Sequence, residues 1–313
     1  MSNYTSQGSW GAPPSYEASQ SYEIARDPPP YHNWQEAVPD TATLPPPPSS
    51  LNYFSNTGNA SSDDADRAHE YCDKHPLYRA VRPSAPVYLS VQERDLQPIT
   101  SNAFQGSITP HPQGRWKGST KDRNGDCLVS THLPLYFAAQ DSPFVTERSK
   151  TIYFEAKILH LRSGPGTDAS GLSLGFVAHP YPYWRSPGWE RGSLGVFSDD
   201  GCRFVNDSWG GQEFTSAFGI GETVGLGMTF HLPDNIALEQ EKGGQKAKVG
   251  VFFTRGGRVT GGWNLHEEAD VETGGVEGLE GDFDLYGAVG LFGGVDFEVT
   301  FDPKGWLWKP ATV

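Results

Sequence analysis

Apolar residues alternate with polar residues or glycine along many short segments after about residue 150, and this period of two is what most constrains the fold. Clear examples are residues 153–158, 224–230 and 295–301. A strand places successive side chains on opposite faces of a sheet, so each run predicts a strand with one face in a core. No long stretch keeps the period of 3.6 that a helix requires. The sequence therefore predicts an all-β fold.

Turn signals rich in glycine and aspartate separate these runs. Asp199-Asp200-Gly201 stands between the runs 194–197 and 203–205, and Arg255-Gly256-Gly257-Arg258 separates two further runs. Short loops of this composition are typical of β-hairpins. Many short strands joined by such turns predict an antiparallel β-sandwich.

The first 75 residues have a different composition. They hold few Leu, Ile or Val and many Pro, Ser, Asn and Asp, including a run of four prolines at 45–48 and the acidic tract 61–66. Such a segment buries too little apolar surface to offset the conformational entropy of ordering its backbone. We therefore expect residues 1–75 to be a disordered, Pro-rich tail.

The middle of the chain carries weaker strand signals. Residues 126–130 and 133–138 have strand-like patterns. We expect residues 76–149 to form an N-terminal extension that packs on a sandwich made by residues 150–313.

Charge and cysteine content exclude several classes of function. The net charge is −14, divided equally between residues 1–75 and the remainder, and no basic stripe is present. This argues against binding to nucleic acids or anionic membranes. Cys72, Cys127 and Cys202 form no C-x-x-C pair, which gives a zinc site no support and suits a reducing compartment. With no signal peptide and no long apolar run, we expect a cytoplasmic protein without a transmembrane segment, metal or cofactor.

Two motifs of the form Pro-Pro-x-Tyr lie in the tail. Their defining residues are Pro13, Pro14 and Tyr16, and then Pro28, Pro29 and Tyr31. The pattern resembles the docking peptide of WW domains. Prolines preset a polyproline II backbone, so little entropy is lost on binding, and the tyrosine adds a large amphipathic ring. A pair of such motifs would arise by chance about one time in a hundred in a tail of this composition. We therefore interpret both as WW-domain ligands.

Seven short segments in the strand-rich part follow one another in a specific order. They are residues 153–158, 172–176, 187–190, 193–201, 219–227, 251–257 and 285–291. Together they resemble the SPRY domain over about residues 150–302. The resemblance implies two packed antiparallel sheets, no active site and a peptide-binding surface built from loops at one edge.

An aromatic cluster lies between two of these segments and is expected to form a loop. Its candidate cargo-binding residues are Tyr181, Tyr183, Trp184 and Arg185. The SPRY resemblance places this loop on the peptide-binding edge. Exposed aromatic rings either pack on their own domain or contact a partner, and both alternatives remain open here. Trp189 and Trp263 lie within strand-like segments, and we expect them in the core.

The combination of a SPRY-like region and two Pro-Pro-x-Tyr motifs further resembles fungal adaptors of WW-domain HECT ubiquitin ligases. That resemblance implies a non-catalytic adaptor that holds a cargo protein, such as a membrane protein, through the SPRY loops and the ligase through the motifs. The alternative is a general scaffold whose WW partner is not a ligase. The chain lacks the N-terminal transmembrane segment of the endosomal adaptors, which leaves recruitment to endosomal or vacuolar membranes open.

Other functional signals are weaker. Residues 171–175 match the G-x-S-x-G nucleophile elbow, but residues 176–178 continue a strand, so we interpret Ser173 as an outward strand position. Asp199-Asp200 beside Gly201 indicates a turn. The acidic stretch 266–284 predicts a solvated loop, with weak calcium binding or pairing with a basic cargo tail as alternatives.

Overall fold

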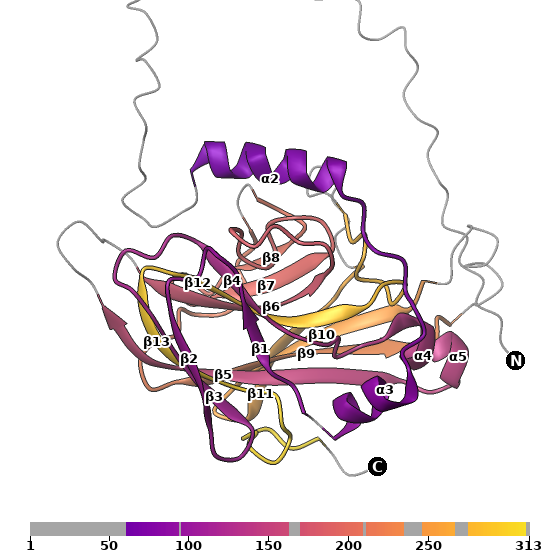
Figure 1. The fold of residues 1–313 in the computed structure, drawn as a ribbon. Coiled ribbons are helices and arrows are strands. Elements are labelled where there is room, and N and C mark those ends of the chain that lie inside the picture. The colour runs from indigo at the N-terminus through magenta and orange to yellow at the C-terminus, as the bar shows by residue number, and fades with distance from the viewer. Residues whose placement is uncertain are drawn as a thin grey trace, which may run out of the picture. The chain divides into compact units, whose positions relative to one another are not determined.

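A computed structural model of the chain describes residues 61–93, 95–162, 170–208, 211–234, 246–266 and 275–310. Two antiparallel sheets pack face to face (Figure 1). In order across the first sheet the strands are β1 (Pro98–Thr100), β4 (Cys127–Thr131), β12 (Leu285–Phe292), β6 (Gly171–Ala178), β7 (Ser193–Phe197) and β8 (Arg203–Val205). The second sheet contains β11 (Arg258–Asn264), β10 (Lys248–Arg255), β9 (Thr223–His231), β5 (Lys150–Arg162), β13 (Gly294–Thr300), β3 (Arg115–Thr120) and β2 (Gly106–His111). The predicted antiparallel β-sandwich is confirmed.

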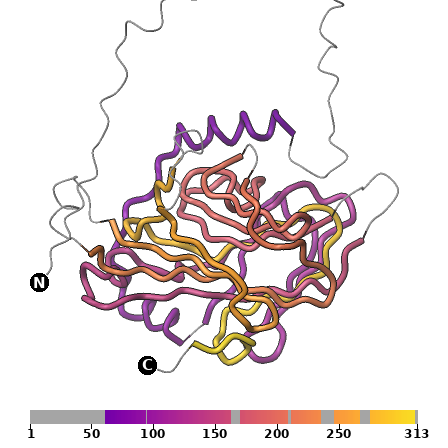
Figure 2. The backbone as a smooth tube through the Cα atoms, turned by 180° about the vertical axis from the view of Figure 1, so that it is seen from behind, coloured from indigo at the N-terminus to yellow at the C-terminus, as the bar shows by residue number. Residues whose placement is uncertain are grey.

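Four helices accompany the sheets in the described part of the chain. They are α2 (Ser62–Lys74), α3 (Ala85–Gln92), α4 (Ala138–Asp141) and α5 (Pro143–Thr146). Figure 2 shows α2 on one side of the sandwich and the C-terminal segment on the opposite side. None of the helices in the described ranges is long and apolar enough to cross a membrane.

The core lies between the two sheets, as the alternating pattern predicts. Along β9, Val224, Leu226, Met228 and Phe230 are each at most 1% exposed. The same holds for Val295, Phe297 and Val299 along β13. Burying one large apolar side chain contributes about 1.5–3 kcal/mol, so these inner faces supply the main favourable free energy of the fold.

Both predicted hairpins are confirmed. Strands β10 and β11 pair up to Arg255 and Arg258, which leaves a two-residue loop of Gly256 and Gly257. The φ angles of these glycines are 56° and 77°. A tight turn with two positive φ angles matches the twist of the flanking strands, and glycine adopts it without strain. In the β7–β8 turn the Cys202 N–H donates to Asp200 Oδ1 at 2.8 Å, so the aspartate pair does form a turn.

The boundaries of the folded part differ from the prediction. Strand β3 pairs with β13 and β4 pairs with β12, so residues 76–149 supply strands of both sheets and are not an extension packed upon them. Helix α2 lies inside the segment predicted to be disordered. Ser61 caps it by accepting from Asp64 N, and acidic residues in its first turn favour the helix dipole. Residues 1–60, with both Pro-Pro-x-Tyr motifs, lie outside the described residues.

Candidate functional site

The aromatic loop joins β6 to β7, and α2 lies across this side of the sandwich near β7 and β8 (Figure 1). Two of the four candidate cargo-binding residues point inward. Tyr181 is 6% exposed, and its hydroxyl donates to Ser186 O at 2.6 Å. Arg185 is 2% exposed, donates to Glu190 Oε1 at 2.7 Å and lies 4.4 Å from the centre of the Trp189 ring. The prediction that Tyr181 and Arg185 face a cargo is wrong, because the loop folds back and uses both side chains to fix its own shape.

The Glu190 carboxylate connects this buried pair to α2. His69 Nε2 on α2 lies 3.6 Å from Glu190 Oε2. Burial raises the pKa of Glu190 above its ordinary value, and the Arg185 guanidinium opposes that rise. The carboxylate therefore lies between a fully buried cation and a partly exposed imidazole.

The other two candidates lie at the surface of the loop. Tyr183 is 42% exposed. Trp184 is half-buried, because two residues of α2 contact its ring. The Arg67 guanidinium carbon lies 4.1 Å from the ring centre, and the centre of the Tyr71 ring lies 5.6 Å from it. Its indole N–H donates to Asp64 O at 3.2 Å, also on α2. Tyr183 is thus open to a partner, whereas Trp184 forms the contact between loop and helix.

The C-terminal end of α2 is held by the same loop. The Arg191 guanidinium donates to Cys72 O at 3.3 Å and also to His75 O. The last carbonyls of a helix have no partner within the helix and carry partial negative charge, so a guanidinium is a suitable ligand for them. Ala68, between the two ends, has no exposed surface. Neither this helix nor its role in covering the loop was predicted from the sequence.

A partly buried carboxyl lies next to the loop, directly before β4. Leu128 N donates to Tyr183 O at 2.9 Å, which places Asp126 close by. Asp126 Oδ1 is covered and has no hydrogen-bond partner among the described residues. Burial raises the pKa of Asp126 to about 8.

The hydrolase-like motif does not form a nucleophile elbow. Ser173 lies within β6, which continues without a turn to Ala178. The prediction of a strand with Ser173 on its outer face is confirmed, since its neighbours Leu172 and Leu174 point into the core, but this outer face is covered and Ser173 has no exposed surface. A side chain at the neighbouring position 290 would meet Ser173, Ser186 and Pro187 together, so the loop after Arg185 covers this face of the sheet. In the described ranges no three His, Cys, Asp or Glu side chains are grouped to hold a metal ion.

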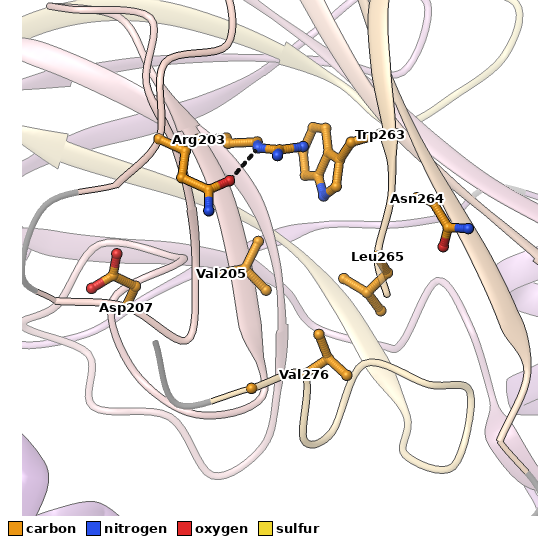
Figure 3. A pocket seen from close by; sticks show the side chains of 9 residues that line it. Arg203, Val205, Asp207, Trp263, Asn264, Leu265 and Val276 are labelled. Atoms are coloured by element: carbon orange, nitrogen blue, oxygen red, sulfur yellow. Dashed lines mark hydrogen bonds between the residues drawn. The ribbon is translucent and has the colours of Figure 1, made fainter. Parts of the chain in front are cut away.

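A small pocket lies at the edge of the sandwich between β8 and the end of β11 (Figure 3). Val205, Leu265 and Val276 line it, and Arg203 Nε donates to Gln212 Oε1 at 3.0 Å beside it. The cavity volume is about 30 Å³, which suits one or two water molecules and is far below the hundreds of Å³ of a ligand cleft. We therefore place the candidate site at the loop.

The two tryptophans predicted to be in the core are buried. Trp189 is 9% exposed and stacks on Phe197, with ring centres 5.4 Å apart. Trp263, beside the small pocket, is 8% exposed. Both predictions are confirmed.

The acidic stretch is only partly described, because residues 267–274 lie outside the described ranges. Glu280 is 4% exposed, and its Oε2 lies 2.5 Å from Lys246 Nζ. Asp284 Oδ1 accepts from Ala138 N at 2.8 Å. The end of the stretch is therefore bound to the sandwich and is not the solvated loop that we predicted.

Comparisons with known proteins relate the chain to SPRY-domain proteins. No protein-family model matches it. The chain is 29% identical over 226 residues to a SPRY domain-containing protein of Schizosaccharomyces pombe, covering 65% of this chain and 50% of the relative. It is 24% identical over 191 residues to protein ssh4 of Sclerotinia sclerotiorum, covering 61% of this chain and 28% of the relative. A human SPRY domain of known structure aligns with a TM-score of 0.38 and 19% identity over 62% of this chain and 95% of that domain. The chain thus spans about half the length of the first relative and under a third of the second.

Proposed function

We propose that the chain is a non-catalytic adaptor that links a cargo protein to a WW-domain HECT ubiquitin ligase. The loop between β6 and β7 holds the cargo, and the two Pro-Pro-x-Tyr motifs hold the ligase, so that the cargo is ubiquitinated and sorted. The observation that carries the cargo half is the exposed ring of Tyr183 on a loop fixed from within by the Arg185–Glu190 pair. Similarity to SPRY-domain proteins supports a protein-interaction role.

A loop of this kind is suited to binding a protein partner. Tyrosine, tryptophan and arginine are the residues that most often dominate the free energy of protein interfaces. A loop that is already ordered loses little conformational entropy when the partner binds. Tyr183 therefore contacts the cargo directly, and Arg185 positions the loop.

The ligase half of the proposal rests on the sequence. Tyr16 and Tyr31 are 15 residues apart. A chain of that length without fixed structure spans roughly 20–23 Å, from about 5–6 Å × √15. Two motifs at that spacing suit a ligase with several WW domains, and linked binding raises avidity by roughly 10²–10⁴. The adaptor acts in the cytoplasm and at the endosomal or vacuolar membrane that carries its cargo.

The test is a reconstituted reaction with ubiquitin, its activating and conjugating enzymes, a purified WW-domain HECT ligase and the full chain. The first readout is ubiquitination of the chain itself, which needs no known cargo. We expect Tyr16→Ala and Tyr31→Ala each to reduce it and the double variant to abolish it. The matched control is the double change Tyr4→Ala and Tyr22→Ala, which alters two tail tyrosines outside the motifs.

The second readout is transfer to a cargo captured with the intact chain and identified by mass spectrometry. The double motif variant should still bind this cargo but no longer promote its modification. If it drives modification at the unaltered rate, the motifs are incidental and the adaptor proposal fails. A scaffold with a non-ligase WW partner would bind WW domains yet promote no ubiquitin transfer.

A further inference from the structure

Helix α2 contacts the loop through features that many helices could offer. Arg67 and Tyr71, one turn apart, contact the same indole ring of Trp184. Arg191 binds main-chain carbonyls at the end of the helix, which depend on no particular side chain. At the centre, the close approach requires only a small residue, and Ala68 supplies it. The surface beneath α2 therefore recognises a helix by its geometry and by one cation–aromatic pair, to which α2 adds the contact of His69 with Glu190.

The core of the sandwich is complete without α2. Neither apolar cluster of the described residues includes a residue between 61 and 75. Of the 13 residues of α2 only Ala68 is buried, and a lone helix of this length is marginal in water. Its Arg67–Asp64 and Lys74–Glu70 ion pairs are internal to the helix and exposed. The helix is thus held mainly by polar and aromatic contacts at its surface.

Release of α2 would change the surface of the loop. The Trp184 ring would lose its cover and join the exposed ring of Tyr183, 4.9 Å away, in one aromatic patch. The Arg191 guanidinium would lose its carbonyl partners on α2 and lie beside this patch, while Glu190 would keep its pair with Arg185. The loop can therefore present either a covered or an uncovered binding surface.

We infer that the surface beneath α2 is a binding site for a helix of a partner protein, and that α2 occupies this site in cis. The partner helix carries an arginine and a tyrosine one turn apart with a small residue next to the arginine, as in Arg67, Ala68 and Tyr71. Its C-terminal carbonyls bind Arg191, which fixes its direction. The inference rests on the proposed function, because it states which kind of segment the cargo offers to the loop.

The test uses the full chain and a labelled synthetic peptide with the sequence of residues 61–75. Ala68→Glu places a charged side chain at the one buried position of α2 and should release α2 from the surface. The matched control is Asp66→Glu, which places the same side chain on the exposed side of the helix. Fluorescence anisotropy should show the peptide binding at least about tenfold more tightly to Ala68→Glu than to the unaltered chain or the control. The reason is that a competitor in cis lowers the fraction of binding-competent protein.

A second probe tests the chemistry of the partner. An alanine-rich helical peptide of the same length, with arginine and tyrosine at the positions of residues 67 and 71, should compete with the first peptide. A peptide in which the two residues are two positions apart should not. Hydrogen exchange should show faster exchange of the α2 amides in Ala68→Glu, with the strands unchanged.

The inference is overturned if the peptide binds no variant, or if Ala68→Glu lowers the melting temperature of the sandwich as a core substitution would. If the two alanine-rich peptides competed equally well, the spacing of arginine and tyrosine would not matter. The proposed recognition of an arginine and a tyrosine one turn apart would then be wrong. The binding assay contains neither ligase nor cargo. The binding assay can therefore contradict the helix site while the ubiquitination assay supports the adaptor function. The opposite pair of results can be distinguished in the same way.

Discussion

Arg185 and Glu190 form an ion pair inside the loop between β6 and β7, with Arg185 Nε 2.7 Å from Glu190 Oε1 and 3% of each side chain exposed. Removing one partner of such a pair leaves an unpaired buried charge, which costs about 3–5 kcal/mol. We expect Arg185→Ala to lower the free energy of unfolding by about this amount in urea denaturation. The double change Arg185→Met and Glu190→Leu should cost less than Arg185→Ala, because no charge is left unpaired. Arg258→Ala, which removes an exposed arginine on β11 away from the loop, is the control. An unaltered stability of Arg185→Ala with loss of cargo binding would instead make Arg185 a contact residue.

Tyr183 and Trp184 are adjacent but should behave differently when replaced. Tyr183→Ala removes an exposed ring, so we expect a melting temperature within a few degrees of the unaltered chain and weaker cargo binding. Trp184→Ala removes the ring that Arg67 and Tyr71 contact, so it should also speed hydrogen exchange in α2. Equal exchange in the two variants would show that Trp184 does not hold the helix.

The strands were predictable because their pattern is local. The alternation along 224–230 identifies both β9 and its inner face. The same reasoning placed Ser173 on the outer face of β6 but could not predict its burial, because whether the outer face of a strand is exposed depends on a distant segment. There the loop containing Ser186 and Pro187 covers it. Residues 76–149 were predicted to pack on the sheets, but the pairing of β3 and β4 within them is non-local and has no signature in their own sequence.

The site was predictable only in part. The aromatic composition located the loop, but the inward direction of Arg185 depends on Glu190 and Trp189, which the fold brings beside it. Helix α2 was missed because its composition is acidic and poor in apolar residues. A capping serine at position 61, Asp63 and Asp64 in the first turn and Lys74 in the last are helix signals that could have identified it.

The buried carboxyl of Asp126 predicts a specific dependence of stability on pH. Its pKa is raised from 3.8 to about 8 by burial, so between about pH 4 and pH 8 the folded protein keeps a proton that the unfolded chain has released. The favourable contribution is therefore complete below about pH 4 and is lost as the pH rises to about 8. The slope is at most about 1.4 kcal/mol per pH unit.

Asp126→Asn isolates this contribution, because the amide does not ionise. We expect urea denaturation to show that the variant gains stability relative to the unaltered chain between pH 5 and pH 9. Asp126 as a residue keeps some exposed surface, but both oxygens of an ionised carboxylate share the charge, so the covered Oδ1 without a hydrogen-bond partner disfavours ionisation. Parallel stability curves for the two proteins would show that Asp126 is ionised in the fold.

Glu155 on β5 should hold the C-terminal segment against the outer face of the second sheet. Its Oε2 accepts from Leu307 N and its Oε1 from Trp308 N, both at 2.8 Å, and the side chain is buried. Hydrogen bonds to a charged acceptor contribute about 1.5–3 kcal/mol each. We expect Glu155→Ala to lower the free energy of unfolding by about 3–6 kcal/mol, the sum of the two bonds, and to remove hydrogen-exchange protection at both amides.

The control for this prediction is Glu298→Ala on the neighbouring strand β13. Glu298 forms an ion pair with Arg115 at 3.2 Å near the surface, and such pairs contribute about 0–1 kcal/mol. Tyr153 also contacts the segment, with ring centres 4.8 Å from Trp306 and 4.6 Å from Trp308. If Glu155→Ala affected the two amides no more than Glu298→Ala does, these aromatic contacts would hold the segment in place. The carboxylate would then serve only to satisfy two main-chain donors.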